Sequence, residues 1–324
     1  MKTLHHRLDP EVAPPLQGLM DAIGGGFNLH DLPGTRAMVE GMVAAVKAEA
    51  PKIDGVATED RLVPGVNGSP DVAVRTYRPA AGSAPLPVLI WMHAGGWVLG
   101  SIEMDDLMVT ALAKDVGCAV VSVNYRLAPE NPFPAPLDDC YAVLRWAVRE
   151  SASLGFDPAR IAVGGASAGG NLAAALALLA RDKGEAKPAL QLLIYPSLDD
   201  TNVEQASDTV PENPFWSREN CLIGWQSYLG KHFGAADVPV YAAPFRATSL
   251  AGLPPAYIAV GEVDMFVEEN IEYARRLIRA EVPTELHVYP GAFHAFDAFA
   301  PESRIARRFV ADRNAALKRA FGLA

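Results

Sequence analysis

Residues 160–181 read RIAVGGASAGGNLAAALALLAR, and this stretch decides the fold. Ile161–Val163 is a short apolar run of the kind that forms a buried strand, and Asn171–Arg181 follows it as a helix. Gly165-Ala166-Ser167-Ala168-Gly169 joins the two, so a G-x-S-x-G motif lies between a strand and a helix. The glycines permit a sharp bend with strained backbone angles. We therefore expect Ser167 to stand exposed at the carboxyl edge of a sheet, at a helix N-terminus that favours developing negative charge.

Short apolar runs alternate with helical patterns on both sides of this unit. Continuous apolar runs are typical of parallel strands that helices cover on both faces, and their alternation with helices indicates an α/β fold. Asn67-Gly68 adds a hairpin signal that pairs Asp60–Val66 with the alternating strand Val72–Tyr77. The other predicted strands are Val88–Trp91, Ala119–Val123, Leu190–Ile194, Tyr257–Val260 and Leu286–Tyr289. Three helices are predicted between and after these strands, each with apolar residues on one face. These residues are Leu137, Cys140, Tyr141 and Leu144 in the first helix, Ile271, Ala274 and Ile278 in the second, and Ala306, Phe309, Val310 and Leu317 in the third.

Two segments stand outside this alternation. The pattern of residues 1–55 predicts two amphipathic helices, one ending at Gly24-Gly25-Gly26 and one before Pro51. Each has a single apolar stripe, which must pack against another part of the protein. The stripes are Leu16, Leu19, Met20 and Ile23 in the first helix, and Met38, Met42 and Val46 in the second. Residues 197–245 carry several aromatic side chains but no clean strand, which is typical of a lid or an insertion.

Composition excludes several classes of partner. The formal net charge of −10 disfavours nucleic acid and anionic membranes. The N-terminus lacks the apolar core of a signal peptide, and the longest apolar run, Leu172–Ala180, is half the length of a membrane helix. Cys118, Cys140 and Cys221 form no metal-ligand pattern. We expect a cytoplasmic protein with no membrane or nucleic-acid partner and no metal.

A second glycine-containing turn follows the strand Val88–Trp91. His93-Ala94-Gly95-Gly96-Trp97 could direct backbone N–H groups to a point above the sheet, where they would bind an oxyanion together with the N–H that follows the serine. The predicted donors are Gly95, Gly96 and Ala168. An ordinary turn between strand and helix would have a similar composition, so this prediction depends on the serine motif.

A nucleophilic serine needs a base, and the base needs a carboxylate that orients it. Three histidines follow Ser167: His232 in the insertion, His287 within a strand, and His294 beyond the end of that strand. Only His294 is placed to reach over the carboxyl edge of the sheet. His287 and His93 are predicted to be structural, and His93 should hold the oxyanion turn by hydrogen bonds.

The carboxylate should follow the strand Tyr257–Val260, because the acid precedes the histidine in this architecture. Asp264 is the first choice and Glu262 the second. Glu268 and Glu269 are expected to begin the next helix, where acidic residues are favoured.

Together these motifs resemble the hormone-sensitive-lipase-like branch of the α/β-hydrolases, the bacterial family IV carboxylesterases. The matching stretches are 93–97 for the oxyanion motif, 165–173 for the serine elbow, 125–130 and 133–135, Asp264-Met265-Phe266, and Gly291–Phe296. The resemblance covers about residues 55–320. Ala94, Ala166 and Met265 depart from the family pattern, but none of them replaces a catalytic group.

The resemblance implies an α/β-hydrolase fold with a mostly parallel eight-stranded sheet, helices on both faces and a helical cap. Residues 1–55 would form the cap with part of 197–245, and residues 56–324 the catalytic domain. It implies a serine carboxylesterase for short- to medium-chain esters, with Ser167, Asp264 and His294 as triad, no cofactor, and a monomeric or homodimeric state. An amidase or peptidase-like hydrolase, and a non-catalytic receptor on the same fold, remain as alternatives.

Overall fold

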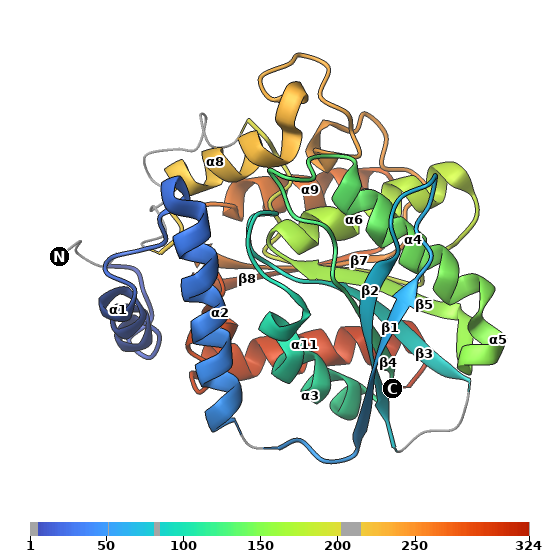
Figure 1. The fold of residues 1–324 in the computed structure, drawn as a ribbon, viewed down its shortest axis with the longest axis horizontal. Coiled ribbons are helices and arrows are strands. Elements are labelled where there is room, and N and C mark those ends of the chain that lie inside the picture. The colour runs from blue at the N-terminus through green and yellow to red at the C-terminus, as the bar shows by residue number, and fades with distance from the viewer. Residues whose placement is uncertain (1–5, 51, 81–84, 202–214, 324) are drawn as a thin grey trace.

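The computed structural model describes residues 6–50, 52–80, 85–201 and 215–323, which fold around an eight-stranded sheet (Figure 1). The strand order is β1-β2-β4-β3-β5-β6-β7-β8; the pairs β1–β2 and β2–β4 are antiparallel and the other pairs are parallel. This confirms the predicted mostly parallel α/β sheet. The strands are β1 Val56–Val63, β2 Val72–Pro79, β3 Leu86–Met92, β4 Ala119–Val123, β5 Phe156–Ala166, β6 Gln191–Ile194, β7 Ala256–Val263 and β8 Thr284–Phe293.

Helices cover both faces of this sheet. In Figure 1, α4 (Ala135–Arg149), α6 (Ala168–Lys183) and α9 (Val267–Arg279) lie above the strands, and α3 (Asp106–Val116) and α11 (Arg304–Phe321) lie below them. Strands β3 and β4 are buried along their whole length, which explains their unbroken apolar sequences. The described ranges also contain short elements: η2 (Ile102–Asp105), α5 (Ser151–Leu154), η3 (Gly230–His232), η4 (Pro244–Arg246) and α10 (Phe296–Phe299).

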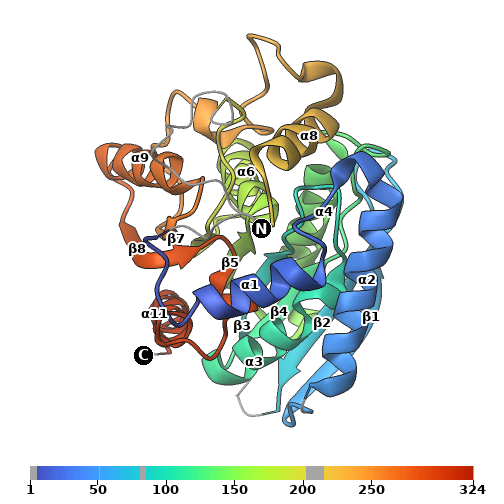
Figure 2. The same cartoon turned by 90° about the vertical axis from the view of Figure 1, so that its left-hand side faces the viewer.

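The N-terminal segment forms α1 (Ala13–Ala22), η1 (Leu29–Asp31) and α2 (Leu32–Glu49), which run along one side of the sheet (Figure 2). Leu16, Met20 and Ile23 are buried, so the predicted stripe of the first helix is confirmed. The stripe predicted for α2 is wrong at its end, because Val46 is 59% exposed.

The same segment meets the insertion at helix α8 (Arg218–Leu229). The N–H of Phe27 donates to the carbonyl of Phe215, and the Asn220 amide donates to the carbonyl of Phe27 at 2.9 Å. His30 and Glu219 add a contact between exposed side chains. The two segments that the sequence sets apart are therefore in direct contact with each other.

Two sequence predictions are corrected. Ile271 and Ile278 do not face the core: they are 42% and 60% exposed, whereas Tyr273 and Leu277 of α9 are buried. Ala274, the third residue of that predicted stripe, is buried, so the prediction is right there and wrong at the two isoleucines, which lie on the flank of the helix. The first strand is Val56–Val63 rather than Asp60–Val66, and Val63 pairs with Val72.

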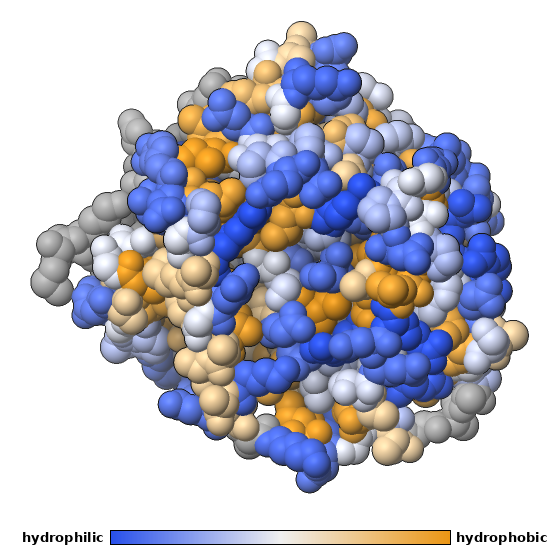
Figure 3. Space-filling model, viewed as in Figure 1, coloured by the Kyte–Doolittle hydropathy of each residue, from blue (hydrophilic) through white to orange (hydrophobic). Residues whose placement is uncertain are grey.

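On the face in Figure 3, hydrophilic residues are interspersed with small hydrophobic patches. Within the described ranges, no helix combines the length and the apolar composition needed to cross a bilayer.

Candidate active site

Ser167 occupies the bend between β5 and α6, as predicted. Its φ of 54° and ψ of −117° lie outside the regions that L-residues favour. The predicted exposure of Ser167 is wrong: the residue is only 7% exposed, because His294 lies against its hydroxyl. Close packing holds the bend. A Cβ at Gly165 would lie 2.3 Å from the carbonyl oxygen of Gly169, and one at Gly169 would lie 2.1 Å from that of Met92. Glycine is therefore required on both sides of the serine.

His294 and Asp264 lie beside this serine. His294 Nε2 is 3.0 Å from Ser167 Oγ, and His294 Nδ1 is 2.8 Å from Asp264 Oδ2. The carboxylate accepts, so Nδ1 carries the proton and the lone pair of Nε2 faces the serine hydroxyl. All three side chains are buried. The geometry therefore joins the three residues selected from the sequence in one hydrogen-bonded line.

Two aromatic rings enclose the His294 imidazole. The Tyr195 ring lies 4.7 Å and the Phe266 ring 5.2 Å from it, between centroids and in edge-on geometry. The Tyr195 hydroxyl donates to Asp297 Oδ1 at 2.9 Å, which ties the turn after β6 to the turn that carries His294. The N–H of Phe266 donates to Asp264 Oδ1 at 3.0 Å. Tyr195 and Asp297 were not identified from the sequence, because no motif marks them.

The turn after β3 is fixed through its carbonyl groups. His93 Nδ1 lies 2.7 Å from the Ala94 carbonyl oxygen, and the N–H groups of Val98 and Leu99 donate to the Gly95 carbonyl. In a trans peptide the C=O and N–H bonds point in opposite directions. The N–H groups of Gly95 and Gly96 therefore point away from those partners. Within the described part of the chain, neither N–H donates a hydrogen bond.

Ala168 is oriented by the same principle. The carbonyl of Ser167 accepts from the N–H groups of Asn171 and Ser197 at 3.0 and 3.3 Å. The N–H of Ala168 lies at the opposite end of that peptide, at the first position of α6. An N–H in the first turn of a helix has no partner within the helix. It is thus available to a negatively charged group.

His93 is a structural residue in this turn. It is fully buried, and burial lowers its pKa to about 4, so the imidazole is neutral at physiological pH. Its ring stacks on Tyr125, whose hydroxyl donates to the His93 carbonyl at 2.8 Å. A neutral ring with a protonated Nδ1 is what the contact with Ala94 requires.

The remaining candidates lie outside this line. His287 contacts Glu285 within β8, and His232 lies in η3. Glu262 accepts from the N–H of Gly291 and from Arg7. Glu268 and Glu269 begin α9 as expected, and Glu269 accepts from the N–H of Leu198.

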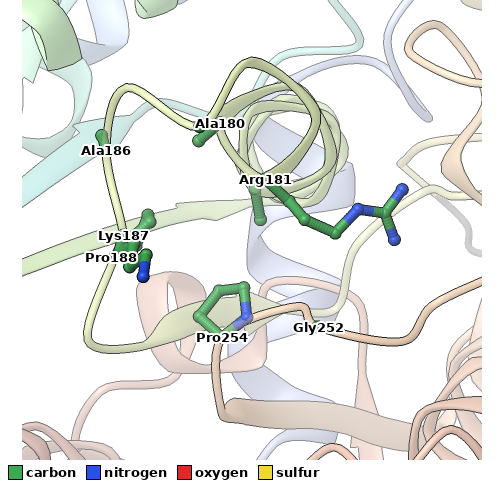
Figure 4. Close-up of a pocket in the computed structure, with 9 residues that line it drawn as sticks. Ala180, Arg181, Ala186, Lys187, Pro188, Gly252 and Pro254 are labelled. Atoms are coloured by element: carbon green, nitrogen blue, oxygen red, sulfur yellow. The ribbon is translucent and has the colours of Figure 1, made fainter.

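A cavity of about 290 Å³ exists elsewhere, at the C-terminal end of α6 (Figure 4). Its lining includes Ala180, Gly184 and Pro254, and the Arg181 side chain extends away from Lys187. Arg181 bonds to the carbonyls of Ser249 and Ala251. The cavity includes none of the predicted site residues. Among the described residues, no cluster of His, Cys, Asp or Glu could hold a metal ion.

Comparison with known proteins agrees with this geometry. A family profile described as alpha/beta hydrolase fold matches residues 89–298. The carboxylesterase NlhH of Mycobacterium tuberculosis is 36% identical over 316 residues, covering 96% of this chain and 97% of the relative. A solved bacterial heroin esterase superposes with a TM-score of 0.91 at 40% identity, covering 97% of this chain and 98% of that one. The solved structure of esterase LipW from Mycobacterium marinum superposes with a TM-score of 0.85 at 38% identity, covering 97% of this chain and 96% of that one.

Proposed function

The chain belongs to the alpha/beta hydrolase fold family, in its hormone-sensitive-lipase-like branch, and we propose that it hydrolyses short- to medium-chain acyl esters through an acyl-enzyme on Ser167. It is a carboxylic ester hydrolase, like the relatives named above. The observation that carries the proposal is the hydrogen-bonded line from Ser167 through His294 to Asp264.

The line supplies each proton transfer that ester hydrolysis needs. Ser167 Oγ attacks the ester carbonyl while His294 Nε2 accepts its proton, and Asp264 stabilises the imidazolium. The C–O bond to the alcohol then breaks as Nε2 returns the proton to the leaving oxygen. A water molecule then attacks the acyl-enzyme carbonyl as Nε2 accepts its proton. The C–O bond to Ser167 breaks as Nε2 returns that proton to Oγ, which releases the acid and free Ser167.

The N–H groups of Gly95, Gly96 and Ala168 are proposed to bind the oxyanion. Their free hydrogens and the fixed carbonyls behind them support this role. Such donors are held in place before the reaction, so they stabilise the tetrahedral intermediate without reorganisation.

Substrate size is proposed to be limited by aromatic side chains from the N-terminal segment and the insertion. Phe215 packs edge-on against Phe27, Phe293 and Phe299, with ring centroids 5.0 to 6.2 Å apart. An apolar wall of this kind favours acyl chains by about 0.8 kcal/mol per buried CH₂ until its length is filled. Residues 1–55 and part of 197–245 are accordingly proposed as the cap. The cytoplasmic location and the oligomeric state stay predictions.

The test is a series of p-nitrophenyl esters with acyl chains from two to sixteen carbons, run beside the matched anilides. We expect kcat/KM to peak at short to medium chains, with anilides far slower. Ser167→Ala should lower kcat by about four to six orders of magnitude, with unchanged thermal unfolding. An aryl phosphonate should label wild-type Ser167 and leave Ser167→Ala unmodified. A Ser167→Ala preparation that still turns over would reject the proposal, and faster anilide hydrolysis would reassign the substrate class.

A further inference from the structure

Arg36 of helix α2 reaches from the N-terminal segment to the turn that carries Gly95 and Gly96. Its Nε donates to the carbonyl of Val98 at 2.8 Å, and one terminal nitrogen donates to the carbonyl of Ala128 at 2.9 Å. The terminal nitrogens also bind both carboxylate oxygens of Glu130, at 2.7 and 2.9 Å. One side chain thus uses its planar set of donors on three acceptors, which is a task that guanidinium geometry suits.

The contact with Val98 continues toward Gly96. The carbonyl that Arg36 binds belongs to the peptide between Val98 and Leu99, whose N–H donates to the Gly95 carbonyl at 2.9 Å. The Gly95 carbonyl belongs in turn to the peptide whose N–H is that of Gly96. Because each trans peptide carries its C=O and N–H in opposite directions, these bonds form one line from guanidinium to Gly96 N–H.

A second branch reaches the same carbonyl. The N–H of Ala128 donates to the Trp97 carbonyl at 2.9 Å, and the N–H of Val98 in that peptide donates to the Gly95 carbonyl at 3.1 Å. The carbonyl of Ala128 is itself bound by Arg36. The Gly95 carbonyl thus accepts from the N–H groups of Val98 and Leu99. Both lie in peptides whose positions are set by Val98 and Ala128, the two residues whose carbonyls Arg36 binds.

We propose that Arg36 is a positioning residue for the oxyanion hole: it aims and polarises the Gly96 N–H through the Val98–Leu99 and Gly95–Gly96 peptides. This inference rests on the proposed function. Hydrogen bonds in a chain polarise one another, and a charged donor at the start strengthens those that follow. The N-terminal helix then contributes to the transition state through Arg36, whose hydrogen bonds go to Val98, Ala128 and Glu130.

The carboxylate of Glu130 keeps the guanidinium in this orientation. The hydrogen bond from Arg36 lowers the pKa of Glu130 to about 2, so the carboxylate is ionised throughout the pH range of an esterase assay. Its side chain is more than half exposed, and the pair is therefore an orienting contact rather than a large source of stability.

The experiment compares Arg36→Ala and Arg36→Lys with Lys47→Ala, in the full-length protein. Lys47 lies on the same helix and pairs with Asp106 of α3, away from the oxyanion turn, so it is a matched loss of one cationic contact. We measure kcat and KM with p-nitrophenyl butyrate, and the inhibition constant of an aryl trifluoromethyl ketone. The adduct of that ketone with Ser167 places an oxyanion in the hole.

Arg36→Ala should lower kcat by about ten- to hundredfold, less than the ~10²–10³ for deleting a donor itself, with KM changed by less than about threefold. The inhibition constant of the ketone should rise by the same factor as kcat falls. Arg36→Lys should lower kcat less than Arg36→Ala does. Lys47→Ala should keep kcat and the inhibition constant within about twofold of wild type. A purely structural contact would lower the melting temperature without this parallel between kcat and ketone affinity.

Equal kcat in wild type and Arg36→Ala, or a change confined to KM, would overturn the inference. Should Arg36→Ala fail to fold, Arg36→Lys and Glu130→Gln decide by the same two readouts, and wild-type values in both would also overturn it. Failure of the proposed function looks different, because wild type itself would then lack Ser167-dependent esterase activity.

Discussion

The indole of Trp216 lies directly against Gly96. A Cβ built at Gly96 would come within 2.3 Å of Trp216 Cζ2 and 2.4 Å of Cη2, so no side chain fits between them. Gly96 also has a φ of 59°, a conformation that glycine adopts at little cost. The insertion thus places an aromatic wall on the turn that carries two of the proposed oxyanion donors.

This wall predicts the effect of Trp216→Ala on substrate size. Removing the indole should raise the ratio of kcat/KM for dodecanoyl to butanoyl esters by about tenfold, since two more CH₂ groups in contact are worth roughly 1.6 kcal/mol. Leu222→Ala, an exposed position on α8, is the control and should leave the ratio unchanged. An unchanged ratio in a well-folded Trp216→Ala would show that acyl chains leave the site in another direction.

The assignment of the carboxylate is tested by a pair of isosteric changes. Asp264→Asn should lower kcat by about 10⁴, because an amide cannot hold His294 with Nδ1 protonated and stabilise its cation. Glu262→Gln should lower kcat only slightly, since the hydrogen bonds of Glu262 within the described ranges go to Gly291 and Arg7 and not to His294. Both are measured with p-nitrophenyl butyrate, together with melting temperatures. The reverse order of severity would identify Glu262 as the orienting acid.

The departure at Ala94 predicts a small effect. The Gly95 N–H is directed by the bond from His93 Nδ1 to the Ala94 carbonyl, which a glycine at position 94 retains. Ala94→Gly should therefore change kcat by less than about tenfold. A loss of ~10²–10³, the size expected for a missing donor, would mean that the Cβ of Ala94 fixes the turn.

Asp105 predicts how stability depends on pH. Its carboxylate accepts from Trp91 Nε1 at 2.7 Å, and burial, with a smaller contribution from Asp297, raises its pKa from 3.8 to about 6. The folded state binds this proton more tightly than the unfolded state. The contribution of Asp105 to the free energy of unfolding therefore falls as the pH rises from 4 to 6. The loss is at most about 3 kcal/mol.

Asp105→Asn keeps an acceptor for Trp91 and removes this cost. The variant should be more stable than wild type in urea at pH 8, and the gain should shrink or vanish at pH 4. An equal difference in unfolding free energy at both values would mean that the Asp105 carboxyl does not titrate differently in the two states.

The proposed cap is tested by removing residues 1–50. The deletion takes away Arg36 and Phe27 and uncovers the partners of the buried Leu16 and Met20, so both stability and kcat should fall. Comparison with Arg36→Ala separates the lost line to Gly96 from the lost apolar cover. A truncated protein that keeps wild-type stability and chain-length preference would contradict the assignment of a cap.

Much of this site follows from short-range patterns. The G-x-S-x-G turn, the glycines after β3 and the positions of Asp264 and His294 beyond strand ends all depend on backbone geometry that a few residues determine. Parallel strands then bring those turns to one edge, and His294 lies within hydrogen-bond distance of both Ser167 and Asp264 there. The regular part of the fold is predictable for the same reason.

Contacts between distant segments were not predictable. Arg36 lies on a helix that shows an ordinary polar face, and nothing in its sequence neighbourhood indicates three acceptors from residues 98–130. On α9, Ile271 and Ile278 satisfy a seven-residue spacing and yet are exposed. The helix packs through Tyr273, Ala274 and Leu277, and only Ala274 belongs to the predicted stripe. A helical repeat shows which residues share a face, but the sheet decides which face is covered.

The close approach of Gly169 to Met92 has a consequence for how this enzyme can change. The helix that follows the nucleophile has no spare room against the end of β3, the strand that leads into the oxyanion turn. A methyl group added at position 169 would have to displace the turn at 93–96, so the two motifs should tolerate mutation only jointly. In a library that varies both, their effects should be strongly non-additive. Grafting the serine elbow alone into another sheet should fail unless the neighbouring strand end is transplanted with it.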